Sequence, residues 1–183
     1  MEEAKWGKLT EEELLYVVEQ IKASSPGNDD NLYTLIHTLG RSGATQYRKL
    51  VERFLYYPSN PMITWIALRT LCIYWSFAES YKDLLKEFIQ GVEWEPRDFL
   101  RINAISCAGQ LLMTHLDRRL LEMLLEIWDR DPNQENPIVQ EAAYEALFYA
   151  AGKTSRDLTK MEEEGRLDLS VIDKARQMVE KLK

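Results

Sequence analysis

The sequence predicts an all-α protein whose helices, about eight to ten in number, pair and stack into a repeat array. Three observations favour this fold class. Only 8 of the 183 residues are glycine and 6 are proline, fewer than the many tight turns of an all-β protein require. Apolar residues recur with the period of an amphipathic helix. Similar segments also return every 32 to 39 residues, a length that fits two helices and two turns.

The first helix of each repeating unit is marked by a small residue at its centre. Three segments have an aliphatic residue, then an alanine four positions later, then an apolar residue after four more; the alanines are Ala67, Ala104 and Ala143. This spacing places all three residues on one helical face, where the alanine lets a neighbouring helix approach closely. A weaker copy is centred on Leu35 and is followed by Gly40.

A second amphipathic segment follows in each unit. These segments have apolar residues at i, i+3, i+4 and i+7, and they span residues 47–55, 81–89 and 120–128. Each is followed by proline, which cannot continue a helix but is well tolerated in a first turn. Asn60-Pro61 and Asn136-Pro137 have the order of an N-cap followed by a first helical residue.

The two ends of the chain differ from the repeats. Thr10 and Glu13 form a capping-box pattern that opens a helix reaching about Ala23. A last helix is expected from Leu169 to Leu182. We therefore expect a single domain over residues 1–183, with an N-terminal capping helix in 1–28, repeats in 29–152 and a C-terminal capping segment in 153–183.

The repeating unit resembles a HEAT repeat or the closely related armadillo repeat. The matching residues are Asp131-Pro132, Val139, Ala142-Ala143 and Ala146-Leu147. Gln140 and Phe148 stand where the pattern usually has arginine and glycine. The resemblance covers roughly residues 30–150 and implies that the helices form a right-handed α-α superhelix, the HEAT-like solenoid. It says little about function, since one fold hosts many functions.

No residue pattern predicts catalysis, a metal site or a cofactor. Nothing in the sequence places His37 and His115 together or beside a nucleophile. Cys72 and Cys107 adjoin core positions and have neither metal-ligand nor disulfide spacing. No glycine-rich phosphate loop, nucleophile elbow or His-Glu-x-x-His motif occurs. We therefore expect a protein that is not an enzyme.

Composition and charge limit the partners. The formal net charge is −7 and the sequence pI about 5.0, which disfavours nucleic acids and anionic membranes because binding to them depends on Lys and Arg. No stretch approaches the ~20 apolar residues of a membrane span. The first residues are acidic where a secretory signal would be basic. We therefore expect a cytoplasmic protein.

Negative charge is concentrated in one repeat. Residues 119–150 contain seven acidic and two basic residues, a net charge of −5. Glu122 and Glu126 are four positions apart on the polar side of one predicted helix, and like charges so placed slightly destabilise it. Asp129 and Asp131 follow. Two interpretations stay open: a solvated, solubilising face, or a docking patch for a basic protein, since complementary charge speeds encounter.

Exposed aromatic residues are a second candidate surface. Most tryptophans are expected in packing between helices, yet Trp and Tyr contribute much of the binding energy at protein interfaces. Tyr56 and Trp94 lie beside predicted turns, and second helices usually line the concave side of a solenoid. The candidate partner-binding residues are Glu52, Tyr56, Glu87, Trp94, Glu122, Glu126, Asp129 and Asp131.

Three functional hypotheses follow. The first is a non-enzymatic protein-binding module, specifically a bacterial immunity protein that neutralises a basic, nuclease-type toxin domain through the acidic surface. The second is a scaffold or assembly factor of the HEAT-repeat type, similar to lyase-type chaperones, that binds through exposed aromatic residues. The third is an enzyme resembling a DNA glycosylase. That enzyme needs a basic groove, whereas here 30 acidic residues outnumber 23 basic ones.

Overall fold

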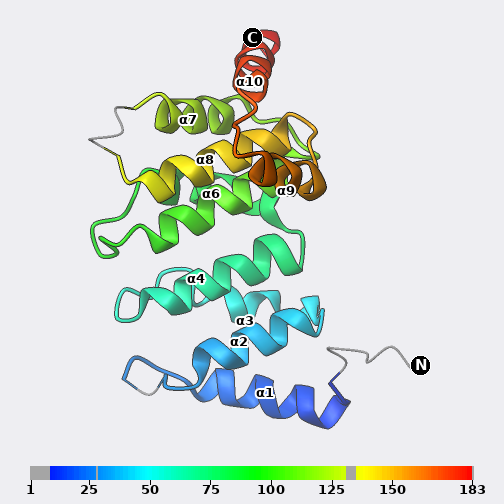
Figure 1. Ribbon diagram of the computed structural model, residues 1–183. Coiled ribbons are helices and arrows are strands. Elements are labelled where there is room, and N and C mark those ends of the chain that lie inside the picture. The colour runs from blue at the N-terminus through cyan, green and yellow to red at the C-terminus, as the bar shows by residue number, and fades with distance from the viewer. Residues whose placement is uncertain (1–8, 28, 131–134, 183) are drawn as a thin grey trace, which may run out of the picture. The chain divides into compact units, whose positions relative to one another are not determined.

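The computed structural model describes residues 9–27, 29–130 and 135–182, apart from the side chain of Glu162. In these ranges the chain is all-α, with ten α-helices and no β-strand, which confirms the predicted fold class (Figure 1). None of the described helices combines the length and apolar character that crossing a bilayer requires. The chain divides into two compact units, Met1–Phe77 and Ala78–Lys183. The right-handed superhelix stays a prediction.

The first unit contains four α-helices and a π-helical turn. They are α1 (Glu11–Ala23), α2 (Leu32–Arg41), α3 (Arg48–Glu52, preceded by the 3₁₀ turn η1, Thr45–Tyr47), α4 (Pro61–Arg69) and the π turn η2 (Thr70–Tyr74). The predicted capping box opens α1: the Thr10 Oγ1 accepts from the Glu13 N–H at 3.2 Å, and the Glu13 carboxylate accepts from the Thr10 N–H at 2.8 Å. The helix expected over 47–55 is shorter than predicted, because the chain turns after α3 toward Pro58.

The three central alanines lie in the core, as predicted. Ala67, Ala104 and Ala143 are all fully buried. The prediction for Leu35 is wrong, because this side chain is only half-buried while its neighbour Ile36 is fully buried. The apolar side chains that α2 buries therefore include Ile36 rather than Leu35, one position later than the weaker repeat pattern indicated.

A glycine brings α2 directly against η2. A Cβ atom added to Gly40 would lie 2.6 Å from the Thr70 Oγ1 and 2.7 Å from the Tyr74 Cδ2. The Gly40 carbonyl also accepts a hydrogen bond from the Trp75 indole N–H at 3.0 Å. The close approach therefore depends on the absence of a side chain at Gly40.

We expect Gly40→Ala to lower the free energy of unfolding by about 1–2 kcal/mol, within the usual range for overpacking a core. The added methyl group meets side-chain atoms of Thr70 and Tyr74, which must shift to accommodate it. Urea unfolding followed by circular dichroism measures the change. Thr34→Ala, at an exposed position of the same helix, is the control and should not destabilise. Equal stability of Gly40→Ala and wild type would contradict the packing argument.

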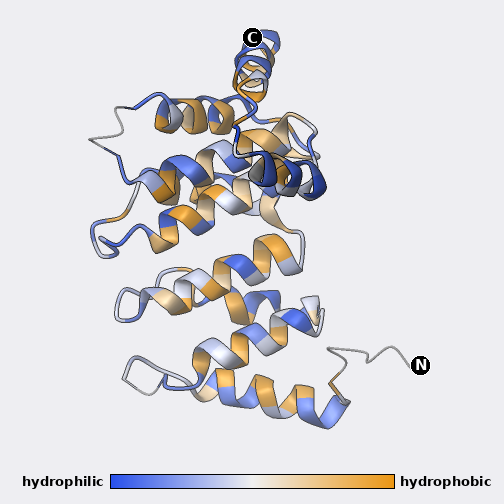
Figure 2. Cartoon of the chain, viewed as in Figure 1, coloured by the Kyte–Doolittle hydropathy of each residue, from blue (hydrophilic) through white to orange (hydrophobic). Residues whose placement is uncertain are grey.

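The second unit contains six α-helices. They are α5 (Lys82–Ile89, preceded by the 3₁₀ turn η3, Ala78–Tyr81), α6 (Phe99–Leu112), α7 (Arg118–Trp128), α8 (Pro137–Ala150), α9 (Ser155–Glu164) and α10 (Ser170–Lys181). The contact between α6 and α8 is the most extensive, and α7 and α10 also pack on α8. Figure 2 shows apolar residues along α6 and α8, whereas α9 is almost entirely hydrophilic.

The backbones of α6 and α8 meet at Gly109. A Cβ atom added there would lie 2.9 Å from the Ala146 Cα and 3.0 Å from its Cβ. Small residues therefore do set the closest approach between these two helices, as the repeat pattern predicted. At this contact the small residues are Gly109 and Ala146 rather than the central alanines.

The C-terminal segment contains one helix more than predicted. The structure confirms a last helix, α10, close to the expected range of 169–182. Before it, α9 begins after Thr154, whose side chain accepts from the Asp157 N–H at 3.3 Å while the Asp157 carboxylate accepts from the Thr154 N–H at 2.8 Å. None of the described side chains of α9 is buried. The helix therefore has no apolar stripe that sequence periodicity could reveal.

Candidate functional site

The acidic residues of α7 lie among arginines of the same helix. The Arg118 Nε donates to the Glu122 carboxylate at 2.9 Å, and the Arg119 guanidinium donates to Glu126 at 3.2 Å. Arg119 also lies 3.6 Å from Glu122. Glu126 is 57% exposed and Glu122 is 28% exposed. In this part of the predicted docking patch, basic side chains therefore lie beside the acidic ones.

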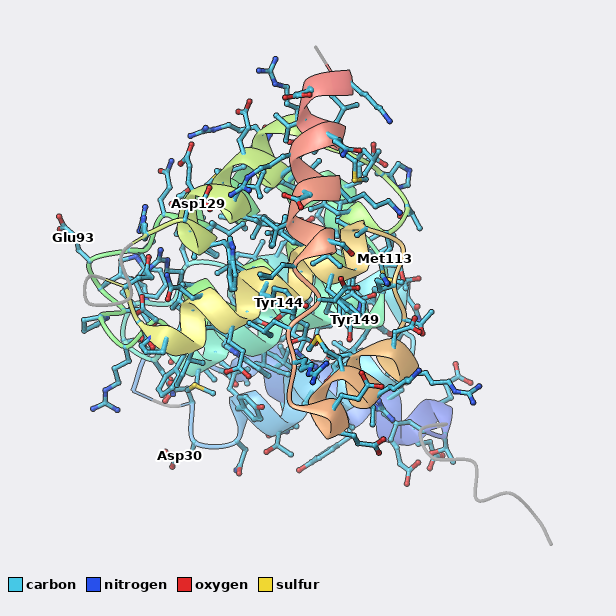
Figure 3. All side chains as sticks on the ribbon, turned by 45° about the horizontal axis from the view of Figure 1, so that its top comes forward. Asp30, Glu93, Met113, Asp129, Tyr144 and Tyr149 are labelled. Atoms are coloured by element: carbon cyan, nitrogen blue, oxygen red, sulfur yellow. The ribbon has the colours of Figure 1, made fainter. Side chains whose placement is uncertain are left out.

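The C-terminal end of α7 is arranged in the same way. The Asp129 carboxylate, labelled in Figure 3, accepts from the Arg176 guanidinium of α10 at 2.8 Å. Asp131 lies outside the described residues. The sequence interval 119–150 misses both Arg118, one position before it, and Arg176, so its net charge of −5 overstates the negative charge of the folded surface.

The other predicted residues are distributed over both units. In the first, Glu52 forms an ion pair with Arg48 at 2.9 Å and Tyr56 is 53% exposed. In the second, Glu87 is exposed on α5, and the half-buried Trp94 packs edge-on against a buried phenylalanine ring. Glu52 and Tyr56 therefore belong to the first unit, whereas Glu87, Trp94 and the acidic residues of α7 belong to the second.

A different surface lies on α2 and α4. On α2, Tyr33, His37 and Arg41 recur every four residues and share one helical face, and Trp65 and Arg69 do the same on α4. The Tyr33 ring stacks on that of His37 with 6.4 Å between centroids and on that of Trp65 with 6.2 Å. The Arg69 guanidinium lies over the Trp65 ring at 5.2 Å.

The π turn completes this surface with Tyr74. In a continuous α-helix, residue 73 would follow Arg69 on the same face, four positions later. In η2 the Trp75 N–H instead bonds to the Thr70 carbonyl at 3.0 Å, five residues back, so that Tyr74 takes this place. Its ring lies 5.7 Å from that of His37 and beneath the Arg41 guanidinium at 5.8 Å. We call this set the aromatic–arginine face: Tyr33, His37, Arg41, Trp65, Arg69 and Tyr74.

The aromatic–arginine face is partly open to solvent and lies in a basic stretch of an acidic protein. Its four rings are half-buried and Arg41 is exposed. Within the described ranges, neither Arg41 nor Arg69 has a carboxylate partner. Residues 31–77 contain five basic residues and one acidic residue. The four-residue spacing of Tyr33, His37 and Arg41 could have indicated this surface from the sequence. Net charges summed over longer intervals could not, because those intervals also contain the acidic residues outside 31–77.

A buried ion pair in the second unit is structural. Arg101 and Glu135, 8% and 9% exposed, form a bidentate pair with both N–O distances at 2.9 Å. The Arg101 Nε also donates to the Ile89 carbonyl at 2.9 Å, and Arg130 donates to Glu135 at 2.7 Å. Burial alone would raise the pKa of Glu135, but the hydrogen bonds from Arg101 and Arg130 outweigh it and hold that pKa below its ordinary value.

A cavity of about 240 Å³ lies between α8 and α9, lined in part by Tyr144, Leu158, Met161 and Leu167. The Tyr144 hydroxyl accepts from the Asp168 N–H at 2.9 Å, and burial raises the pKa of this tyrosine. Its polar atom is thus engaged in holding the connection between α9 and α10.

Cys72 and Cys107 are buried free thiols. No cluster of three metal-ligating side chains occurs in the part of the chain that the structure describes.

Comparison of the chain with known protein families, with curated proteins and with solved structures finds no match. The interpretation of the aromatic–arginine face therefore depends on its own chemistry. Rings that lie beside two guanidinium groups, one over Trp65 and one over Tyr74, can bind a ligand through apolar and charged contacts.

Proposed function

We propose that this chain is a non-enzymatic protein-binding module that recognises its partner through the aromatic–arginine face. The composition of that face carries the proposal, because Tyr, Trp and Arg are the residue types that contribute most to binding at protein interfaces. Its four half-buried rings offer apolar contact area at a low cost in conformational entropy. This composition supports the scaffold or assembly factor best among the three hypotheses.

A HEAT-like superhelix is the fold-level part of the same proposal. The buried central alanines and the repeat spacing support it. In such arrays, paired helices present extended surfaces on a rigid support, and partners bind without catalysis. The aromatic–arginine face lies on α2 and α4, the first helices of two successive repeats in the predicted array, and it has the form of such a surface.

The acidic sequence also motivates the role of an immunity protein that neutralises a basic, nuclease-type toxin. In that case Glu126 and Asp129, both at least half exposed, would meet the partner on α7. Arg119 and Arg176 already pair with these carboxylates, which weakens the negative potential that would steer a basic protein. We therefore favour the aromatic–arginine face as the binding surface and keep α7 as the alternative surface to be tested.

Site-specific cross-linking distinguishes the two surfaces. A photoreactive benzophenone amino acid is placed at position 33 or position 126 of the full chain, and each protein is irradiated in cells of the organism that encodes it. We expect position 33 to cross-link to one protein that position 126 does not reach. With that protein purified, Tyr33→Ala with His37→Ala should weaken binding at least about tenfold, which equals 1.4 kcal/mol.

Charge reversal on α7 is the matched control. Glu122→Lys with Glu126→Lys should leave the affinity within about threefold, since neither residue belongs to the aromatic–arginine face. Circular dichroism checks that each variant is folded. A cross-link from position 126 alone, with binding abolished by the charge reversal, would replace our proposal by the acidic docking surface. The absence of a cross-linked protein at either position would overturn the protein-binding function.

A further inference from the structure

We infer that the aromatic–arginine face binds an acidic segment of the partner protein. Carboxylates of that segment would pair with Arg41 and Arg69, and an apolar or aromatic side chain would lie on the neighbouring rings. The inference rests on the proposed function and adds the chemical class of the ligand. The acidic composition led us to expect a basic partner, whereas the segment inferred here is acidic.

The two arginines are placed to receive carboxylates. Each guanidinium lies over an aromatic ring, Arg69 over Trp65 at 5.2 Å and Arg41 over Tyr74 at 5.8 Å. Stacking on a ring uses the flat face of a guanidinium and leaves the N–H donors at its edge for a planar, bidentate partner such as a carboxylate. In the described ranges no carboxylate of the chain itself takes this role.

The rings next to the arginines supply the apolar part of the site. Trp65, Tyr33, His37 and Tyr74 form a series of ring contacts, with centroids 6.2, 6.4 and 5.7 Å apart. All four are half-buried, so part of each side chain is open to solvent. An apolar side chain beside the carboxylates of the ligand would complement rings that lie next to the two guanidinium groups.

The surrounding charge favours the same ligand. Of the five basic residues in 31–77, Arg48 and Lys49 both pair with Glu52. Arg41, Arg53 and Arg69 are then the basic residues of this stretch for which no carboxylate partner occurs among the described residues. Single-stranded nucleic acid also combines anionic charge with stacking groups, but proteins bind it in positively charged grooves that follow the backbone. Three arginines in a chain of net charge −7 suit a short acidic peptide better.

Selection from a display library of random 15-residue peptides tests the inference with the full-length chain as bait. We expect the enriched peptides to be rich in Asp and Glu around at least one aromatic or aliphatic residue. A synthetic copy of the most enriched peptide, titrated calorimetrically, should bind at least about tenfold more weakly to Arg41→Gln with Arg69→Gln. Arg156→Gln with Arg166→Gln, two exposed arginines of the second unit, is the matched control and should change the affinity less than about twofold.

Each other result counts against the inference. It is overturned by enriched peptides that are neutral or basic, by equal loss in the control variant, and by unchanged binding in Arg41→Gln with Arg69→Gln. Tighter binding of a 15-nucleotide single-stranded DNA, lost in that same variant, would assign the face to nucleic acid instead. A partner that still cross-links from position 33 while the library yields no acidic peptide would leave the proposed function standing and remove only its acidic ligand.

Discussion

Glu135→Ala is expected to lower the free energy of unfolding by about 3–5 kcal/mol, the usual effect of leaving one member of a buried ion pair without its partner. The carboxylate accepts both bonds of the Arg101 guanidinium and a third from Arg130. Its removal takes both 2.9 Å bonds from the Arg101 guanidinium, which is 8% exposed and keeps only the more distant Asp98 carboxylate at 3.6 Å. Chemical unfolding followed by circular dichroism measures the change.

Two controls separate this effect from ordinary surface electrostatics. Glu126→Ala removes an exposed carboxylate that also pairs with an arginine, and it should lower stability by no more than about 1 kcal/mol. Replacing both buried partners, Arg101→Met with Glu135→Leu, should be much less damaging than Glu135→Ala, because no unpaired charge remains. A double variant less stable than Glu135→Ala would contradict the interpretation.

The same carboxylate should make stability depend on pH. The pKa of Glu135 in the folded protein lies below its ordinary value of 4.5, so folding favours the ionised form. Its contribution is fully present above that ordinary value and is lost as the pH falls through the lowered pKa of the folded state. The stability difference between wild type and Glu135→Gln should therefore be constant near neutral pH and shrink at acidic pH. A difference that grows as the pH falls would contradict the assignment.

Gly109→Ala is expected to lower the free energy of unfolding by about 3 kcal/mol, the upper end of the usual cost of overpacking. The new methyl group meets the Ala146 Cα at 2.9 Å, and a backbone atom cannot rotate away as a side chain can. The helix propensity gained on replacing glycine, about 1 kcal/mol, is too small to offset the separation of α6 from α8. Urea unfolding again gives the measurement.

A double-mutant cycle localises this effect. Ala146→Gly removes the methyl group that lies 3.0 Å from the new Cβ, so it should recover part of the stability lost in Gly109→Ala although it destabilises the wild type. Gln110→Ala, at an exposed position of the same helix, controls for helix propensity. Strictly additive effects at positions 109 and 146 would show that the contact is not the cause.

Local patterns in the sequence predicted most of the helices, because each long helix buries one apolar stripe. Ala104 and Ala143 could be placed in the core for this reason. The helix α9 could not be predicted in this way, since it buries none of its described side chains. The position of Leu35 was wrong by one residue because the fourth repeat copy shares little of the pattern that aligns the other three.

The binding surface was harder to predict than the fold. Arg118, the partner of Glu122, lies four positions before it and just outside the interval in which the charges were summed. Arg176, the partner of Asp129, is 47 residues away, so counting charges along the sequence could not show that pair. Tyr74 joins Trp65 and Arg69 only through the five-residue spacing of η2. Neither helical periodicity nor propensity distinguishes such a turn from the α-helix before it.

The π turn η2 accommodates one extra residue without changing the direction of the side chains that follow it. Deleting one residue of 70–73 would leave Tyr74 four positions after Arg69, the spacing that keeps two side chains on one face of a regular α-helix. If the full-length chain instead took regular α-helical bonding here, Tyr74 and Trp75 would turn by about 100°, away from His37 and from the Gly40 carbonyl. The surface therefore tolerates a shorter chain at this point better than a tighter helix.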